Sequence, residues 1–151
     1  MSDFRYFIKV LPILLVLGGI GGPLGAQPNG EGSTALIGLT LGEVLSRFGV
    51  PQAVYPVRGR EEWQDDVVFE YENQDLYIYR DRVWQLGLKT AYGITLGDSR
   101  QLVLLVLGER AQVFSGYIQA SLPGESWPLK FRVNMDPQDK VSGLFIYRSD
   151  F

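Results

Sequence analysis

A six-residue motif that occurs twice in the chain constrains its fold more than any other feature. Residues 38–43 read GLTLGE and residues 93–98 read GITLGD. Further matches follow in the same order: Phe48-Gly49 with Leu107-Gly108, Val54-Tyr55 with Val113-Phe114, Glu61-Glu62-Trp63 with Glu125-Ser126-Trp127, and Asp81-Arg82-Val83 with Asp139-Lys140-Val141. The order is preserved while the spacing drifts, as loop insertions would cause. The sequence therefore predicts two tandem copies of one unit, over residues 36–90 and 91–151.

Each copy of the motif resembles the start of a helix. Thr40 followed by Glu43 is a capping box, in which each residue satisfies a backbone amide of the other, and we expect Thr95 and Asp98 to do the same. Apolar residues at helical spacing, Leu41, Val44, Leu45 and Phe48, predict a short amphipathic helix that Gly49 can end. The second helix is expected over residues 96–107. Its unbroken apolar run indicates deep burial, with a strand as the alternative.

After each helix the apolar residues alternate, as in strands with one buried face. The residues expected to face the helices are Val67, Phe69, Tyr71, Leu76, Ile78, Trp84, Leu86 and Leu88 in the first copy, and Leu129, Phe131, Val133, Met135, Leu144 and Ile146 in the second. A turn over residues 136–139 joins the last two strands. The pattern predicts an α+β fold with the helices on one face of an antiparallel sheet and the other face, here termed the open face, without a cover.

The first 26 residues are typical of a secretory signal. Arg5 and Lys9 precede an apolar run over residues 10–17, and a glycine-rich stretch leads to Ala26, where we expect cleavage. A flexible polar linker over residues 27–35 would then open the mature chain. An uncleaved anchor is the alternative, although the apolar run is shorter than the roughly 20 residues that a spanning helix needs. The protein is therefore expected in the periplasm or outside the cell.

Composition excludes several classes of function. The chain has no cysteine and no histidine, so disulfides, zinc–thiolate sites and Ser-His or Cys-His catalysis are impossible. A net charge of −3 disfavours nucleic acid as a partner. Adjacent carboxylates such as Glu61-Glu62 rarely point together, and the acidic pair Asp136 and Asp139 fits a turn better than a calcium loop. We expect no enzymatic activity, no cofactor and no bound metal.

The segment from Gly38 to Pro51 resembles the opening motif of the SmpA/OmlA (BamE) envelope family, which also marks the repeats of the β-lactamase inhibitor protein. The tandem pairing is more similar to the inhibitor protein. Members of both families act by binding proteins, so the resemblance implies a protein partner. The lipid-bearing cysteine of the first family and the paired cysteines of the second are both missing.

Two groups of residues are candidates for protein binding. On the open face we expect Val68, Glu70, Tyr77, Tyr79, Val83, Gln85, Lys130, Arg132, Phe145 and Tyr147, and in the loop over residues 55–66 we expect Arg58 and Arg60. The predicted binding residues are Tyr77, Tyr79, Arg132, Phe145, Tyr147, Arg58 and Arg60. Large aromatic and arginine side chains anchor protein interfaces. The alternative is that the aromatic residues only stabilise the sheet. Trp63 and Trp127 are expected to pack beneath the helices rather than bind.

The sequence as a whole predicts an exported bacterial envelope protein that binds an envelope or secreted protein, in an assembly or inhibitor-like role. A purely structural envelope protein is one alternative. A small outer-membrane β-barrel is another, although two capped helices argue against it.

Overall fold

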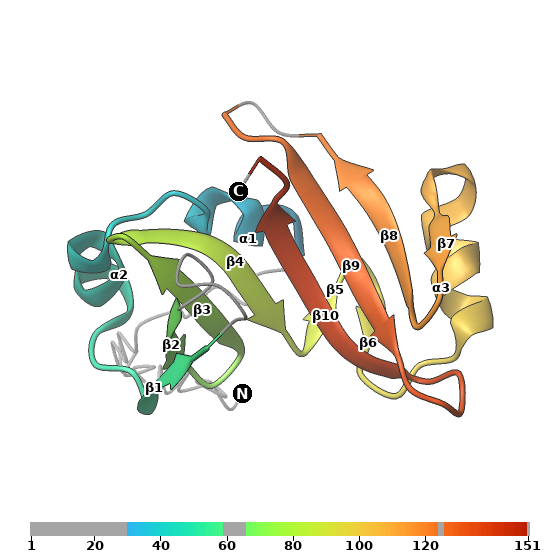
Figure 1. The fold of residues 1–151 in the computed structure, drawn as a ribbon, viewed down its shortest axis with the longest axis horizontal. Coiled ribbons are helices and arrows are strands. Elements are labelled where there is room, and N and C mark those ends of the chain that lie inside the picture. Colours follow the sequence, from blue (N-terminus) through green and yellow to red (C-terminus); the bar gives the residue numbers. More distant parts are fainter. Residues whose placement is uncertain (1–29, 59–65, 124–125, 151) are drawn as a thin grey trace, which may run out of the picture.

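The computed structural model describes residues 30–58, 66–123 and 126–150. These residues form an eight-stranded antiparallel sheet in the order β1-β2-β3-β4-β10-β9-β8-β7, flanked by helices (Figure 1). The strands are β1 (Ala53–Val57), β2 (Asp66–Glu70), β3 (Gln74–Tyr79), β4 (Arg82–Leu88), β7 (Gln112–Phe114), β8 (Tyr117–Leu122), β9 (Leu129–Met135) and β10 (Val141–Arg148). A separate hairpin pairs β5 (Thr90–Ala91) with β6 (Ile94–Thr95). The α+β class is confirmed.

Two eight-residue helices lie at opposite ends of the sheet (Figure 1). Helix α2 (Leu41–Phe48) begins at Thr40, whose hydroxyl oxygen accepts a hydrogen bond from the Glu43 amide while the Glu43 carboxylate accepts one from the Thr40 amide. This confirms the predicted capping box. Helix α3 (Arg100–Leu107) ends at Gly108. No helix in the described ranges is long and apolar enough to cross a membrane.

One hydrophobic core joins the helices to the sheet. Val44 of α2 and Val103 and Leu107 of α3 are buried in the same cluster. The strands contribute Leu76, Leu86, Ile146, Phe131 and Ala120, which lie side by side across β3, β4, β10, β9 and β8. Because directly paired residues of an antiparallel sheet share a face, the residues that alternate with them lie on the open face.

The second helix begins four residues later than the sequence motif predicts. Thr95 lies in strand β6, and Ser99 caps α3 by accepting a hydrogen bond from the Leu102 amide. Gly97 has a φ of 88° and donates its amide to the Val141 carbonyl, a conformation that a right-handed helix cannot continue through. Asp98 still accepts a hydrogen bond from the Thr95 amide, so part of the capping pattern survives in a turn.

The expected deep burial of the second helix is also wrong. Leu105 is 78% exposed, and only Val103 and Leu107 of α3 are fully buried. The helix packs one side against the end of the sheet, which leaves the rest of its apolar run at the surface. The expected polar linker is likewise replaced by structure over its described part. Gly30–Ser33 forms the one-turn helix α1, Thr34–Leu36 forms the 3-10 turn η1, and Ser33 is buried.

A β-bulge in the middle of the sheet alters the predicted alternation of β4. Tyr77 pairs with Gln85 but Ile78 pairs with Val83, so Trp84 is an extra residue between the two pairs. One inserted residue moves the neighbouring side chains to opposite faces. Val83 is therefore fully buried in the core, and Trp84 joins Gln85 on the open face. The sequence predicts the reverse for Val83 and Trp84.

Candidate functional site

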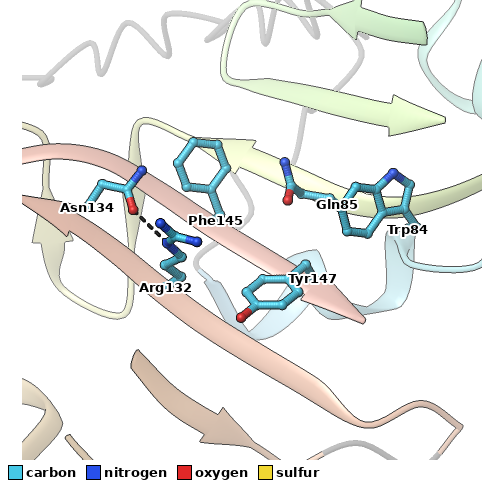
Figure 2. Close-up of a pocket in the computed structure, with 6 residues that line it drawn as sticks. All are labelled: Trp84, Gln85, Arg132, Asn134, Phe145 and Tyr147. Atoms are coloured by element: carbon cyan, nitrogen blue, oxygen red, sulfur yellow. Dashed lines mark hydrogen bonds between the residues drawn. The ribbon is translucent and has the colours of Figure 1, made fainter. Parts of the chain in front are cut away.

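The open face contains a hollow of about 320 Å³ near the middle of the sheet. Figure 2 shows its six lining residues, which come from three adjacent strands: Trp84 and Gln85 from β4, Phe145 and Tyr147 from β10, and Arg132 and Asn134 from β9. Three aromatic rings, two amides and one guanidinium therefore converge on one depression. We term it the central hollow.

The bulge in β4 places Trp84 at one wall of the central hollow. Its indole Nε1 donates a 2.8 Å hydrogen bond to the Asp66 carboxylate at the start of β2. Asp66 is only 7% exposed, and Val68, two residues along the same face, is fully buried. The predicted exposure of Val68 is therefore wrong, although Val68 lies on the open face opposite Tyr55 and Tyr77.

Arg132 is the charged group of the central hollow, and its neighbours hold it in place. Its Nε donates a 2.8 Å hydrogen bond to the Asn134 Oδ1 atom, drawn as a dashed line in Figure 2. Its guanidinium carbon lies 4.0 Å from the centre of the Tyr117 ring, a cation–π contact. Tyr117 in turn stacks on Phe114 with 4.6 Å between ring centres. A guanidinium held on one face and at one nitrogen is pre-organised for binding.

The aromatic residues of β10 are held by contacts across the sheet. The Tyr147 hydroxyl donates a 2.6 Å hydrogen bond to the Gln119 side chain on β8. The Phe145 ring meets the Tyr77 ring edge to face at 6.4 Å, and it lies over Gly143, where an added Cβ would be 2.7 Å from the ring. The glycine therefore provides the space that the Phe145 ring occupies.

Burial changes the acidity of several groups on this face. Burial raises the pKa of Tyr77 to about 12, and the nearby Asp75 carboxylate adds to the rise. Burial also raises the pKa of Asp75, and Glu70 adds to it while Lys89 opposes it. The pKa of Tyr147 is raised by burial although the positive charge of Arg132 opposes the rise. All three hydroxyl or carboxyl groups are thus partly withdrawn from water.

Charge is unevenly distributed over the open face. The carboxylates Asp66, Glu70 and Asp75 lie on β2 and β3, whereas the cations Lys130 and Arg132 lie on β9. Among the residues that the structure describes, the ion pairs within 4 Å are Arg100–Asp139 and Arg148–Asp150. Neither includes the two cations of β9, so this half of the face is positive.

The structure brings four of the seven predicted binding residues together. Arg132, Phe145 and Tyr147 line the central hollow, and Tyr77 contacts Phe145 beside it. Tyr79 lies farther along β3, with the Arg80 guanidinium 5.1 Å from its ring centre. Arg58 follows the end of β1 at the exposed edge of the sheet, away from the lining residues of the hollow. Arg60 and Trp63 lie outside the described residues.

Three residues of the central hollow are missing from the predicted binding residues: Gln85, which was expected on the open face, and Trp84 and Asn134, which were not. The alternation of apolar residues predicts Trp84 in the core, because alternation alone does not reveal the bulge. Asn134 follows Arg132 by two positions, so the alternation of β9 was sufficient to place it on the open face. Trp127, predicted to pack inward, does contact the core and lies beneath the Arg148 guanidinium at 3.7 Å.

The described residues contain no group of three or more acidic side chains that could hold a metal ion. The Asp136 side chain instead accepts hydrogen bonds from the Gln138 and Lys140 amides, as the predicted turn requires. What the central hollow offers chemically is flat apolar surface, amide groups and one fixed positive charge.

Comparison with known proteins gives a match of fold. No protein-family model and no curated protein matches the sequence. One solved structure that is similar is an extracellular protein containing an SCP domain from Bacillus anthracis, with a TM-score of 0.50 and 9% sequence identity. The match covers 78% of this chain and 45% of that chain, so this chain spans less than half of its length.

These findings correct the expected family. The predicted resemblance to the SmpA/OmlA (BamE) family and to the β-lactamase inhibitor protein is wrong, because no model of either family matches and the fold matches the Bacillus anthracis protein instead. The motif that suggested the resemblance consists of a capping box and a glycine stop. Such residues specify how a helix begins and ends, and helices of unrelated families share them.

Proposed function

We propose that this chain is an exported protein that binds another protein through the open face of its sheet, with the central hollow at the centre of the contact. The observation that carries the proposal is the convergence of Trp84, Phe145, Tyr147 and Arg132 on one depression. Tryptophan, tyrosine and arginine are enriched among residues that dominate binding energy, and such residues cluster in pockets near the centre of an interface.

Export is supported by two independent observations. Residues 1–26 have the charge, apolar run and small-residue end of a secretory signal, although they lie outside the described residues. The similar solved structure is that of an extracellular protein. The absence of cysteine and histidine from the sequence supports a binding role rather than a catalytic one.

We also infer that the chain consists of two tandem units, paired in a register different from that of the sequence motif. The Gly38 and Gly97 amides donate to the Val83 and Val141 carbonyls, both at 2.8 Å. Isolated bridges join Thr40 to Arg82 and Ser99 to Lys140. The strand order reads outward from the central pair β4 and β10 in the same way on both sides. This register aligns Thr40 with Ser99 instead of Thr95.

Affinity capture from secreted and envelope fractions tests the binding proposal. Tyr147→Ala and Arg132→Ala should each weaken capture of the partner by about 2 kcal/mol, the typical cost of losing an interface hot spot. Leu105→Ala is the matched control, because Leu105 is exposed on α3 at the end of the sheet. Equal capture by all three variants, each shown to be folded, would contradict the proposal.

A further inference from the structure

Arg132 carries a positive charge that no described carboxylate neutralises. The ion pairs of the described residues involve other arginines, and the carboxylates of the open face lie three or more strands away, on β2 and β3. The other lining residues of the central hollow are aromatic or amide side chains. Its electrostatic character is therefore that of a small site for an anion.

The contacts of Arg132 leave one part of its guanidinium available. Asn134 occupies Nε and Tyr117 covers one face of the group. No described residue accepts a hydrogen bond from the two terminal nitrogens, whose N–H groups are therefore available as parallel donors. A pair of parallel donors matches the two oxygens of a carboxylate, and such charge-assisted pairs are among the stronger hydrogen bonds in proteins.

We propose that the central hollow binds the side-chain carboxylate of an acidic residue in the partner protein, with an adjacent aromatic or apolar residue of the partner packed against Trp84, Phe145 and Tyr147. This inference rests on the proposed function and specifies the chemical group that the partner presents. Lys130, next to Tyr147 in the paired register, extends the positive surface around the hollow. Charge complementarity thus selects an acidic segment.

The volume of the hollow and its single guanidinium favour a side-chain carboxylate over a small molecule or a phosphorylated peptide. A volume of about 320 Å³ lies at the lower end of small-molecule pockets, which span about 300–1,000 Å³, and suits one or two side chains. Phosphorylated peptides are recognised by clusters of arginines, whereas one guanidinium lines this hollow.

The surroundings of the hollow favour an acidic residue inside a chain over a free carboxyl terminus. A second depression of about 210 Å³ adjoins the central hollow, and Phe145 lines both. Tyr77 and Lys89 are among its other lining residues. A chain with an acidic residue in the hollow can continue into the second depression. A chain that ends in the hollow would not need this second depression.

Three short peptides test the inference on the full mature chain. Acetyl-Trp-Glu-amide carries a side-chain carboxylate, acetyl-Trp-Gln-amide is its neutral match, and acetyl-Trp-Gln with a free carboxyl terminus carries the charge at the chain end. Binding is measured by NMR titration, following the side-chain signals of Arg132 Nε, Asn134 and Gln85. We expect the glutamate peptide to bind at least about tenfold more tightly than the neutral peptide, because hydrogen bonds to a charged group are lost in the latter.

Variants separate a fixed site from general attraction to positive charge. Arg132→Gln should remove the preference for the glutamate peptide, whereas Lys130→Gln, which removes the same charge from the same strand outside the lining of the hollow, should largely keep it. Equal losses in the two variants would overturn the inference. So would equal binding of the charged and neutral peptides, or preference for the peptide with the free carboxyl terminus.

The outcomes also separate this inference from the proposed function. If capture of a protein depends on Tyr147 but the peptides bind without regard to charge, the carboxylate site is wrong and protein binding by the open face stands. If the hollow selects the glutamate peptide through Arg132 while no protein contact depends on the face, the proposed function is wrong.

Discussion

The Thr40 hydroxyl accepts a hydrogen bond from the Glu43 amide, and Ser99 does the same for the Leu102 amide at the start of α3. Replacing either residue by alanine should lower the free energy of unfolding by about 1 kcal/mol, because a helix amide loses its partner. Thr95→Ala is the control, since Thr95 lies in strand β6. Chemical denaturation measures all three, and a loss at Thr95 as large as that at Ser99 would contradict the assigned helix start.

The hydroxyl of Tyr77 should make the stability of the protein depend on pH in the alkaline range. Because burial raises its pKa in the folded chain to about 12, the unfolded chain loses this proton first as the pH rises. The contribution of this hydroxyl to the free energy of unfolding should therefore be steady below about pH 10 and fall between about pH 10 and 12. Tyr77→Phe should make this fall shallower in denaturation curves recorded across that range. An unchanged slope would show that Tyr77 is not withdrawn from water.

At the scale of elements, β4 depends on its bulge. The bulge directs Trp84 to the open face, where its indole N–H bonds to the buried Asp66 carboxylate. Trp84→Phe keeps an aromatic wall but removes this donor, so we expect a loss of stability of about 1–3 kcal/mol, measured by denaturation. Trp84→Phe in an Asp66→Asn background should cost less. Equal costs in the two backgrounds would show that the hydrogen bond does not contribute.

Elements with local signals could be predicted from the sequence, and those that depend on partners could not. Thr40, Glu43 and Gly49 define α2 by contacts within a few residues. The start of α3 depends instead on Gly97, whose amide bonds to Val141 far along the chain. The edge strands β1 and β7 are exposed on both sides and have no apolar alternation to reveal them. The bulge at Trp84 has no local signal either, because it arises from the pairing of β3 with β4.

At the scale of the whole molecule, the side of the sheet that each residue occupies was easier to predict than the site. Alternation correctly placed Tyr77, Arg132, Phe145 and Tyr147 on one face. It gave no indication that β4 lies beside β10, because these two strands pair across more than fifty residues of sequence. The central hollow is formed by that pairing, so its lining residues could not be predicted from the alternation within single strands.

Gly143 of β10 leaves space for the Phe145 ring, which lines the central hollow. An alanine Cβ there would lie 2.7 Å from the Phe145 ring, so Gly143→Ala should displace the ring and weaken binding of the glutamate peptide in the NMR titration. Gly42→Ala is the matched control, because an added Cβ in helix α2 meets nothing within 4 Å. That variant should keep the affinity and gain about 0.5–1 kcal/mol of stability. Loss of affinity in both variants would contradict the role of the Phe145 ring.

Site-specific photocrosslinking tests the central claim most directly. A photoreactive amino acid is placed at Gln85, which lines the central hollow, or at Leu105, which is 78% exposed on α3. The account predicts that exported protein crosslinks from position 85 to one protein with an acidic segment at the crosslinked site, and that Arg132→Gln reduces the yield. Position 105 should give no such product. Crosslinks to the same protein from both positions, or from position 105 alone, would contradict binding through the open face.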